Sequence, residues 1–128
     1  MNVFEAVQEF NDKFEFKVQD TPGFLDKHLF HVREYFMAEE LDEYVRAHDD
    51  KNLPEVLDGL IDLLYVVVGT MIFHGWTPEQ MAEAFRRVHE ANMKKVKVLT
   101  ESESKRGTLY DAKKPEGWQP PDLEDLCK

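Results

Sequence analysis

Residues 53–73 have the sequence LPEVLDGLIDLLYVVVGTMIF and form the most apolar segment of the chain. When this segment is drawn as a helix, apolar side chains occur on every side, and a helix that is apolar all round is normally buried at the centre of a fold. The β-branched run Val66–Val68 would suit a strand in isolation, but the length of the segment favours a helix. We therefore expect residues 53–73 to form the central helix of an all-α protein.

Three further helices are predicted around this segment. Apolar residues with helical spacing and breaks at Gly and Pro place them at about residues 2–13, 25–47 and 77–97. The last has the clearest start, because Thr77, Pro78 and Gln80 form a capping box. Short connections between helices predict an antiparallel four-helix-type bundle over residues 1–100. Residues 101–128 are polar and proline-rich, and we expect an extended C-terminal tail that docks on the bundle or on a partner subunit.

Composition excludes several classes of protein. The chain has 128 residues, 26 Asp+Glu, 16 Lys+Arg and a formal net charge of −10, which works against binding to a nucleic-acid backbone. Its single cysteine, Cys127, excludes an internal disulfide. Glu55, Asp58 and Asp62 argue against a membrane span over residues 53–73. We expect a cytoplasmic protein that binds neither nucleic acid nor membrane.

Acidic residues occupy the apolar face of the helix predicted at 25–47. Helical periodicity places Glu40 about 40° from Phe36, and Glu43 and Glu39 about 20° and about 60° to the other side. An E-E-x-x-E pattern alone is more often a solvated helix face. Here, however, the three carboxylates overlap the side that should face the core, so we consider a buried role.

A second acidic set lies within the most apolar helix. Asp58 and Asp62 are i, i+4 neighbours on one stripe, together with Glu55 and Tyr65. The alternative explanation of these acids is that one edge of a core helix is exposed to solvent. Clustered carboxylates repel one another, and nearby Arg33 could neutralise only one of them. Oxygen ligands of this kind favour Mg²⁺ or Mn²⁺ over zinc, so the two acidic sets predict a metal site between the helices.

The helix predicted at 77–97 carries two further candidates. Asn92 lies at the centre of its apolar face and Lys95 at the edge. A core amide bonded to the backbone and an ordinary surface lysine are the simpler explanations of these two residues.

Taken in order, these motifs resemble those of a known family. The segments are EELDE at 39–43, DGLIDLLYVVVGT at 58–70, VHEANMKK at 88–95 and KKPEGWQPPDL at 113–123. They are similar to MazG-like all-α nucleoside triphosphate pyrophosphohydrolases, and in particular to the phosphoribosyl-ATP pyrophosphohydrolase-like branch. The resemblance covers residues 1–126.

The resemblance implies a homodimer or homotetramer that cleaves a nucleotide substrate between its α and β phosphates. It also implies Mg²⁺, with Mn²⁺ as a substitute, held by Glu39 or Glu40 with Glu43 and by Asp62. Either Glu39 or Glu40 would act as the catalytic base. The family pattern would put an acid at position 59, where this chain has Gly59. Either Glu55 or Asp58 would therefore join Asp62, and we take Asp58 as the ligand.

The resemblance further implies substrate contacts at Asn92 and Lys95, to which we add Arg33 and Tyr65. Two alternatives remain open. One is a true phosphoribosyl-ATP hydrolase, and the other is a non-enzymatic acidic protein that binds a partner. Such a partner-binding protein would spread its acids over its outer face, whereas Asp58 and Asp62 lie in the most apolar helix.

Overall fold

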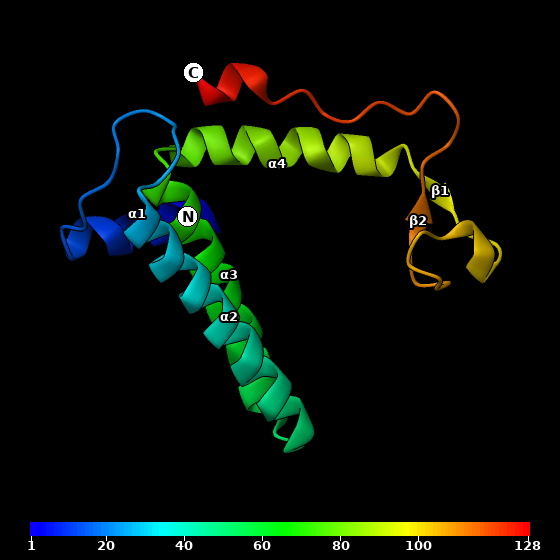
Figure 1. Ribbon diagram of the computed structural model, residues 1–128, viewed down its shortest axis with the longest axis horizontal. Helices are drawn as coiled ribbons and strands as arrows, with labels where there is room; N and C mark the ends of the chain where they lie inside the picture. The colour runs from blue at the N-terminus through cyan, green and yellow to red at the C-terminus, as the bar shows by residue number, and fades with distance from the viewer. The chain divides into compact units, whose positions relative to one another are not determined.

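The computed structural model describes residues 1–128 and confirms an all-α protein (Figure 1). Its helices are α1 (Val3–Lys13), α2 (Lys27–Asp49), α3 (Leu53–Phe73) and α4 (Pro78–Met93). Two short strands, β1 (Val96–Lys97) and β2 (Ala112–Lys113), and two 3₁₀ helices, η1 (Glu101–Glu103) and η2 (Glu124–Cys127), follow α4. The chain divides into two compact units, Met1–Met81 with Lys128 and Ala82–Cys127. A four-helix bundle that includes α4 stays a prediction.

Each helix begins at a polar cap. The side chains of Asn2, Asp26 and Asn52 accept a hydrogen bond from the backbone N–H three residues later, at the starts of α1, α2 and α3. The capping box at α4 is confirmed, because the Gln80 N–H donates to Thr77 Oγ1 at 3.2 Å and the Thr77 N–H donates to Gln80 Oε1 at 2.9 Å. The residues that begin each helix are therefore found next to one another in the sequence.

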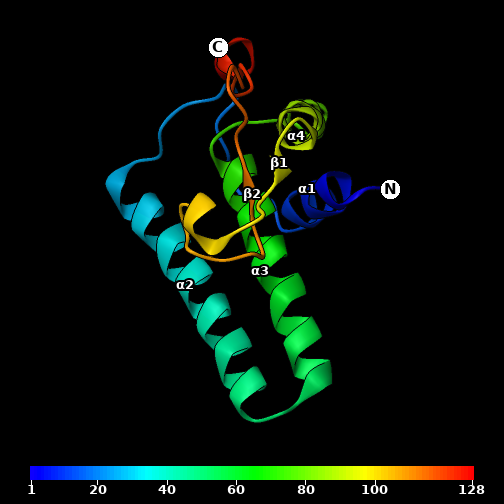
Figure 2. The same cartoon turned by 90° about the vertical axis from the view of Figure 1, so that its right-hand side faces the viewer.

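Helices α2 and α3 form an antiparallel hairpin and lie side by side in Figures 1 and 2. Residues 50–52 connect them, and Lys51 adopts a left-handed backbone with φ of 56°. Gly59 is buried in this interface, where a Cβ atom would lie 3.2 Å from Tyr44 Cα. The absence of a side chain at position 59 thus lets the two backbones approach closely at this point.

The core of the first unit lies around the C-terminal half of α3. Val7, Val68, Ile72 and Met81 are buried there, with Tyr65 and Trp76 among the residues packed against them. Within the single chain α3 is covered only in part, so the expectation that it is buried on every side stays a prediction that needs a partner subunit. Of its 21 residues, only Gly59, Val68, Gly69 and Ile72 are buried, because α2 and α1 are the helices that pack on it within this unit.

Helix α3 is also long and apolar enough to cross a membrane by length and composition alone. Core helices of soluble proteins meet the same criteria.

The connection from α3 to α4 depends on Gly75. Its φ is 106°, and a Cβ atom there would lie 2.3 Å from the carbonyl oxygen of Thr21. Gly75→Ala should therefore lower the free energy of unfolding by more than about 2 kcal/mol, since backbone strain and a clash with main chain add. Urea denaturation measures the change. Gly107→Ala is the matched control, because Gly107 has φ of 69° but no atom within 4 Å of the added Cβ. Equal losses in both variants would contradict the steric argument.

The second unit gives the tail more structure than an extended chain. Helix α4 ends at Met93 rather than near Lys97, because β1 pairs antiparallel with β2, Val96 opposite Lys113. The indole Nε1 of Trp118 donates to the Ala91 carbonyl oxygen at 2.7 Å. Arg87 pairs with Asp125 at 2.6 Å. The C-terminal residues are thereby attached to α4.

Candidate functional site

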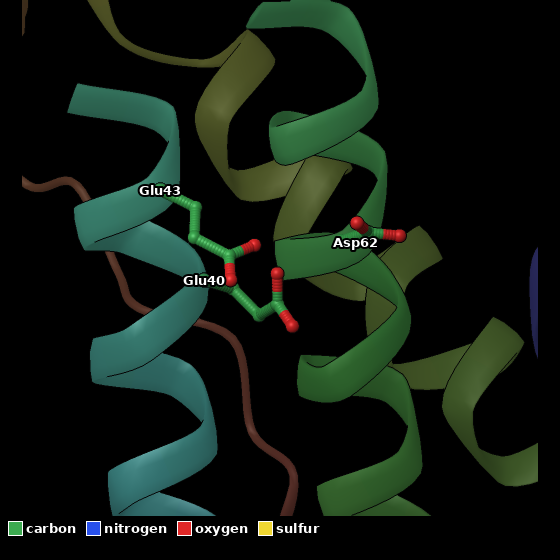
Figure 3. A group of neighbouring side chains, drawn as sticks. All are labelled: Glu40, Glu43 and Asp62. Carbon is green, nitrogen blue, oxygen red and sulfur yellow. The ribbon is translucent and has the colours of Figure 1, made fainter. Parts of the chain in front are cut away.

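Three carboxylates meet between α2 and α3. Glu40 and Glu43 extend from α2 toward Asp62 on α3 (Figure 3), and one carboxylate oxygen from each lies within 4.8 Å of the others. The spacing of three residues places Glu40 and Glu43 one turn apart on the same face of α2. The predicted convergence of the two acidic sets is therefore present for these three residues.

The carboxylates of this group destabilise one another in their ionised forms. Burial raises the pKa of Glu40 to about 7, with further contributions from Glu43, Asp62 and Glu39. Burial also raises the pKa of Asp62, and the charges of Asp58 and Glu43 add to the effect. The Oε2 atom of Glu40 is buried without a hydrogen-bond partner. Converging oxygens, mutual repulsion and an unpaired buried oxygen are the properties of a site that fits a divalent cation.

The remaining predicted acids lie outside this group of three. Glu39 is exposed and accepts a hydrogen bond from the Tyr35 hydroxyl, which raises the pKa of Tyr35. Asp58 is exposed, one turn before Asp62, and Glu55 is exposed in the first turn of α3. At position 59, where the family pattern would put an acid, a Cβ atom would make a tight contact with the Tyr44 backbone, which would have to shift slightly to admit a side chain.

A cavity of about 650 Å³ adjoins the carboxylates within the first unit. Glu40 and Asp62 belong to its lining, and most of the rest of its wall is apolar. The aromatic members of the wall are Phe10, Phe16, Phe36, Tyr65 and Phe73. A volume of this size and an aromatic wall suit a small planar molecule. By contrast, Phe24 lies outside this cavity and is 96% exposed.

Arg33 is a half-buried cation in the lining of the same cavity. Its Nε donates to Thr70 Oγ1 at 3.1 Å and its Nη2 donates to the Val66 carbonyl oxygen at 3.0 Å. The guanidinium carbon lies 4.9 Å from the centre of the Phe73 ring. Burial lowers the pKa of Arg33. These contacts hold the positive charge in the wall of the cavity. Arg33 therefore forms no ion pair with the three converging carboxylates.

The family model for phosphoribosyl-ATP pyrophosphohydrolase matches residues 7–92. The chain belongs to the phosphoribosyl-ATP pyrophosphohydrolase family. A search of curated proteins found no match to the chain. Membership in this family supports a pyrophosphohydrolase enzyme, and its typical metal dependence agrees with the acidic group formed by Glu40, Glu43 and Asp62.

The family match covers most of α1, all of α2 and α3, and most of α4. It therefore contains all three converging carboxylates, Arg33 and Tyr65, as well as Asn92. Asn92 is exposed in the last turn of α4, in the second unit, and Lys95 lies beyond the match. Lys95 is half-buried, and its Nζ atom lies 5.4 Å from the ring centre of Trp118.

Lys95 also lines a second cavity, of about 380 Å³, within the second unit. The other basic residues of that cavity are Lys105, Arg106, Lys113 and Lys114, and its acids are Glu103 and Asp111. Lys113 pairs with Glu103, and Asp111 accepts a hydrogen bond from Ser104 Oγ at 2.8 Å. The cavity consequently has an excess of positive charge in a chain whose net charge is −10.

Sequence reasoning missed Asn11 in this phosphoribosyl-ATP pyrophosphohydrolase family member. It is only 4% exposed and lines the larger cavity from α1. The available signal was a polar residue beside Phe10 within an otherwise apolar helix face. Thr70 was missed as well, and nothing in the sequence alone pairs it with Arg33.

Proposed function

We propose that the chain is a Mg²⁺-dependent nucleoside triphosphate pyrophosphohydrolase that produces a monophosphate and pyrophosphate. The observation that carries the proposal is the convergence of Glu40, Glu43 and Asp62 beside an aromatic-lined cavity. Anionic oxygens on a triphosphate and on these carboxylates would repel each other without a cation between them. The acidic net charge of the chain is thereby compatible with a phosphate-bearing substrate.

The three carboxylates are the proposed cation ligands. The all-oxygen donor set is appropriate for Mg²⁺, with Mn²⁺ as a substitute, and Asp58 adds a fourth carboxylate one turn before Asp62. A bound divalent cation would neutralise the triphosphate and lower the pKa of the attacking water.

The proposed base is a glutamate on α2. Glu39 and Glu40 are both candidates from the sequence. Because Glu40 belongs to the converging group, Glu39 is the freer of the two to accept a proton from water. No Ser or Cys nucleophile is required, since the water attacks phosphorus directly.

The substrate contacts follow from the cavity. Its aromatic wall, including Tyr65, would stack against a nucleobase, and Arg33 places a positive charge beside it. Asn92 and Lys95 are proposed as phosphate contacts on the basis of the family resemblance.

A second candidate function is hydrolysis of phosphoribosyl-ATP, the substrate for which the matching family is named. It involves the same bond and the same carboxylates, so only the substrate distinguishes the two candidates. A non-enzymatic role as an acidic partner-binding protein is less well supported, because such a role does not explain why three acids converge beside a cavity.

The test is pyrophosphate release from a panel of ribo- and deoxyribonucleoside triphosphates and from phosphoribosyl-ATP. Each substrate is assayed with Mg²⁺, with Mn²⁺ and with a chelator. We expect metal-dependent release of one pyrophosphate for each monophosphate formed. Release of single phosphate groups, or activity unaffected by the chelator, would contradict the proposal.

We also propose that the protein is a homodimer or homotetramer. Leu53 and Leu57, in the first turns of α3, are 76% and 64% exposed, and Ile61 is 50% exposed. Exposed apolar side chains on consecutive turns form the kind of face that a second copy covers. Sedimentation velocity at micromolar concentration should show a dimer or tetramer, and Leu57→Lys should shift it toward smaller species. A monomeric wild type would contradict this prediction.

A further inference from the structure

Asn11 has a buried donor that the fold does not satisfy. The residue is 4% exposed on α1, and its Nδ2 atom is buried without a hydrogen-bond partner. An amide N–H removed from water and left unpaired destabilises the folded state. Such a group in a native protein calls for an explanation, and for Asn11 the adjoining space is the 650 Å³ cavity.

The surroundings of Asn11 indicate what would satisfy it. The same cavity is lined by aromatic rings and by Glu40 and Asp62, the proposed cation ligands. Phe10, the residue before Asn11, packs edge-on against Tyr65, with ring centres 5.3 Å apart. A planar ligand among these rings would turn its polar edge toward the wall of the cavity, and an edge that reaches Asn11 would pair the N–H group that the fold leaves unsatisfied.

We propose that Asn11 recognises the nucleobase of the substrate, with Nδ2 donating to a carbonyl oxygen of the base. The inference depends on the proposed function, because it assumes a nucleotide in this cavity. Asn11 would be a specificity-determining residue and take no part in the cleavage of the phosphoanhydride.

This contact selects a class of base. Uracil, thymine and guanine carry a carbonyl oxygen next to a ring N–H, which complements the donor and acceptor of a carboxamide. Adenine has no carbonyl oxygen, and the adenine nucleotide phosphoribosyl-ATP would therefore be a poor substrate. A carboxamide turned end for end would instead present Oδ1 and favour the amino group of adenine, so the base preference of the wild type tests the assignment.

The experiment compares Asn11→Leu, which keeps the approximate shape and removes the hydrogen bond, with Gln8→Leu. Gln8 is an amide on the same helix, bonded to Asp12 at 2.9 Å, and does not line the cavity. The substrates are dUTP, dTTP, dGTP, dATP and a deoxyribose triphosphate without a base, all with Mg²⁺.

We expect wild type to prefer dUTP, dTTP or dGTP over dATP. Asn11→Leu should lower kcat/KM for the preferred nucleotides by roughly 10–100-fold, mainly through KM, because a specific base contact is lost. Activity on the base-free triphosphate should not change. The melting temperature without ligand should rise, because an unpaired polar group leaves the interior. Gln8→Leu should not alter the base preference.

Two results would overturn the inference. One is a wild-type preference for dATP or phosphoribosyl-ATP. The other is an equal loss on every substrate, including the base-free one, together with a lower melting temperature, as expected of a structural residue.

If wild type releases no pyrophosphate from any nucleotide, the proposed function fails separately. Asn11 is then judged by calorimetric binding of deoxyuridine, deoxyguanosine and deoxyadenosine to wild type and Asn11→Leu. Loss of selective binding to the first two supports the inference, and its absence overturns it.

Discussion

Asp62→Asn is expected to abolish pyrophosphate release and, at the same time, to stabilise the metal-free protein. The substitution keeps the shape of the side chain and removes one charge from a group of three carboxylates whose oxygens lie within 4.8 Å. Mutation of a residue that hydrogen-bonds to a metal ligand typically lowers metal affinity or activity about 10–100-fold, so loss of a direct ligand should lower kcat by more than about 100-fold. Burial and the charges of Asp58 and Glu43 raise the pKa of Asp62, so ionised Asp62 is unfavourable in the folded state without metal.

Thermal melts with and without Mg²⁺ separate this result from a structural role. If Asp62 were bonded within the core, its replacement would lower the free energy of unfolding by about 1–3 kcal/mol. Asp42→Asn is the control, because Asp42 is an exposed partner of Arg46 at 2.9 Å and lies outside the carboxylate group. A variant that is less stable without Mg²⁺ yet gains as much stability from Mg²⁺ as wild type would end the metal-site hypothesis.

Glu40→Gln is expected to remove a pH dependence of stability as well as activity. The folded-state pKa of Glu40 is about 7, above its ordinary value of 4.5, so the folded protein binds this proton more tightly than the unfolded chain. Stability associated with the proton is fully present below pH 4.5 and is lost as the pH rises through about 7. Glutamine cannot ionise, so the variant should match or exceed wild type at pH 8 without metal.

Urea denaturation in chelator at pH 5 and pH 8 measures the effect. Wild type should lose stability between the two values, and Glu40→Gln should lose less. When Mg²⁺ replaces the chelator, the stability of wild type at pH 8 should be restored, whereas that of the variant should not change. The cation offsets the repulsion between ionised carboxylates only where Glu40 is present. Glu9→Gln, an exposed glutamate on α1, serves as the control. A Glu40→Gln variant that is less stable than wild type at pH 8 would contradict the repulsion argument.

The sequence predicted the helices well, since the signals for a helix are local. The apolar pattern and the capping residues gave α3 its observed bounds, Leu53–Phe73, and placed the start of α4 at its capping box. The end of α4 was predicted too late, because pairing of Val96 with Lys113 depends on residues 17 positions away. Helical rotation alone also placed Glu40 and Glu43 toward the core, since angles around a helix follow directly from residue number.

The sequence by itself thus determined an all-α protein, and it predicted two acidic sets that face each other across α2 and α3. Only the tertiary structure decided that Glu40, Glu43 and Asp62 converge while Glu39 and Asp58 lie outside, since this depends on how far α3 slides along α2. At that register Gly59 lies close to the Tyr44 backbone, where a side chain would be tightly placed. The cavity likewise required the packing of α1, which brings Asn11 to the same space as Asp62, 51 residues later. Such contacts arise from side-chain volumes fitted between separate helices, and no local spacing rule contains them.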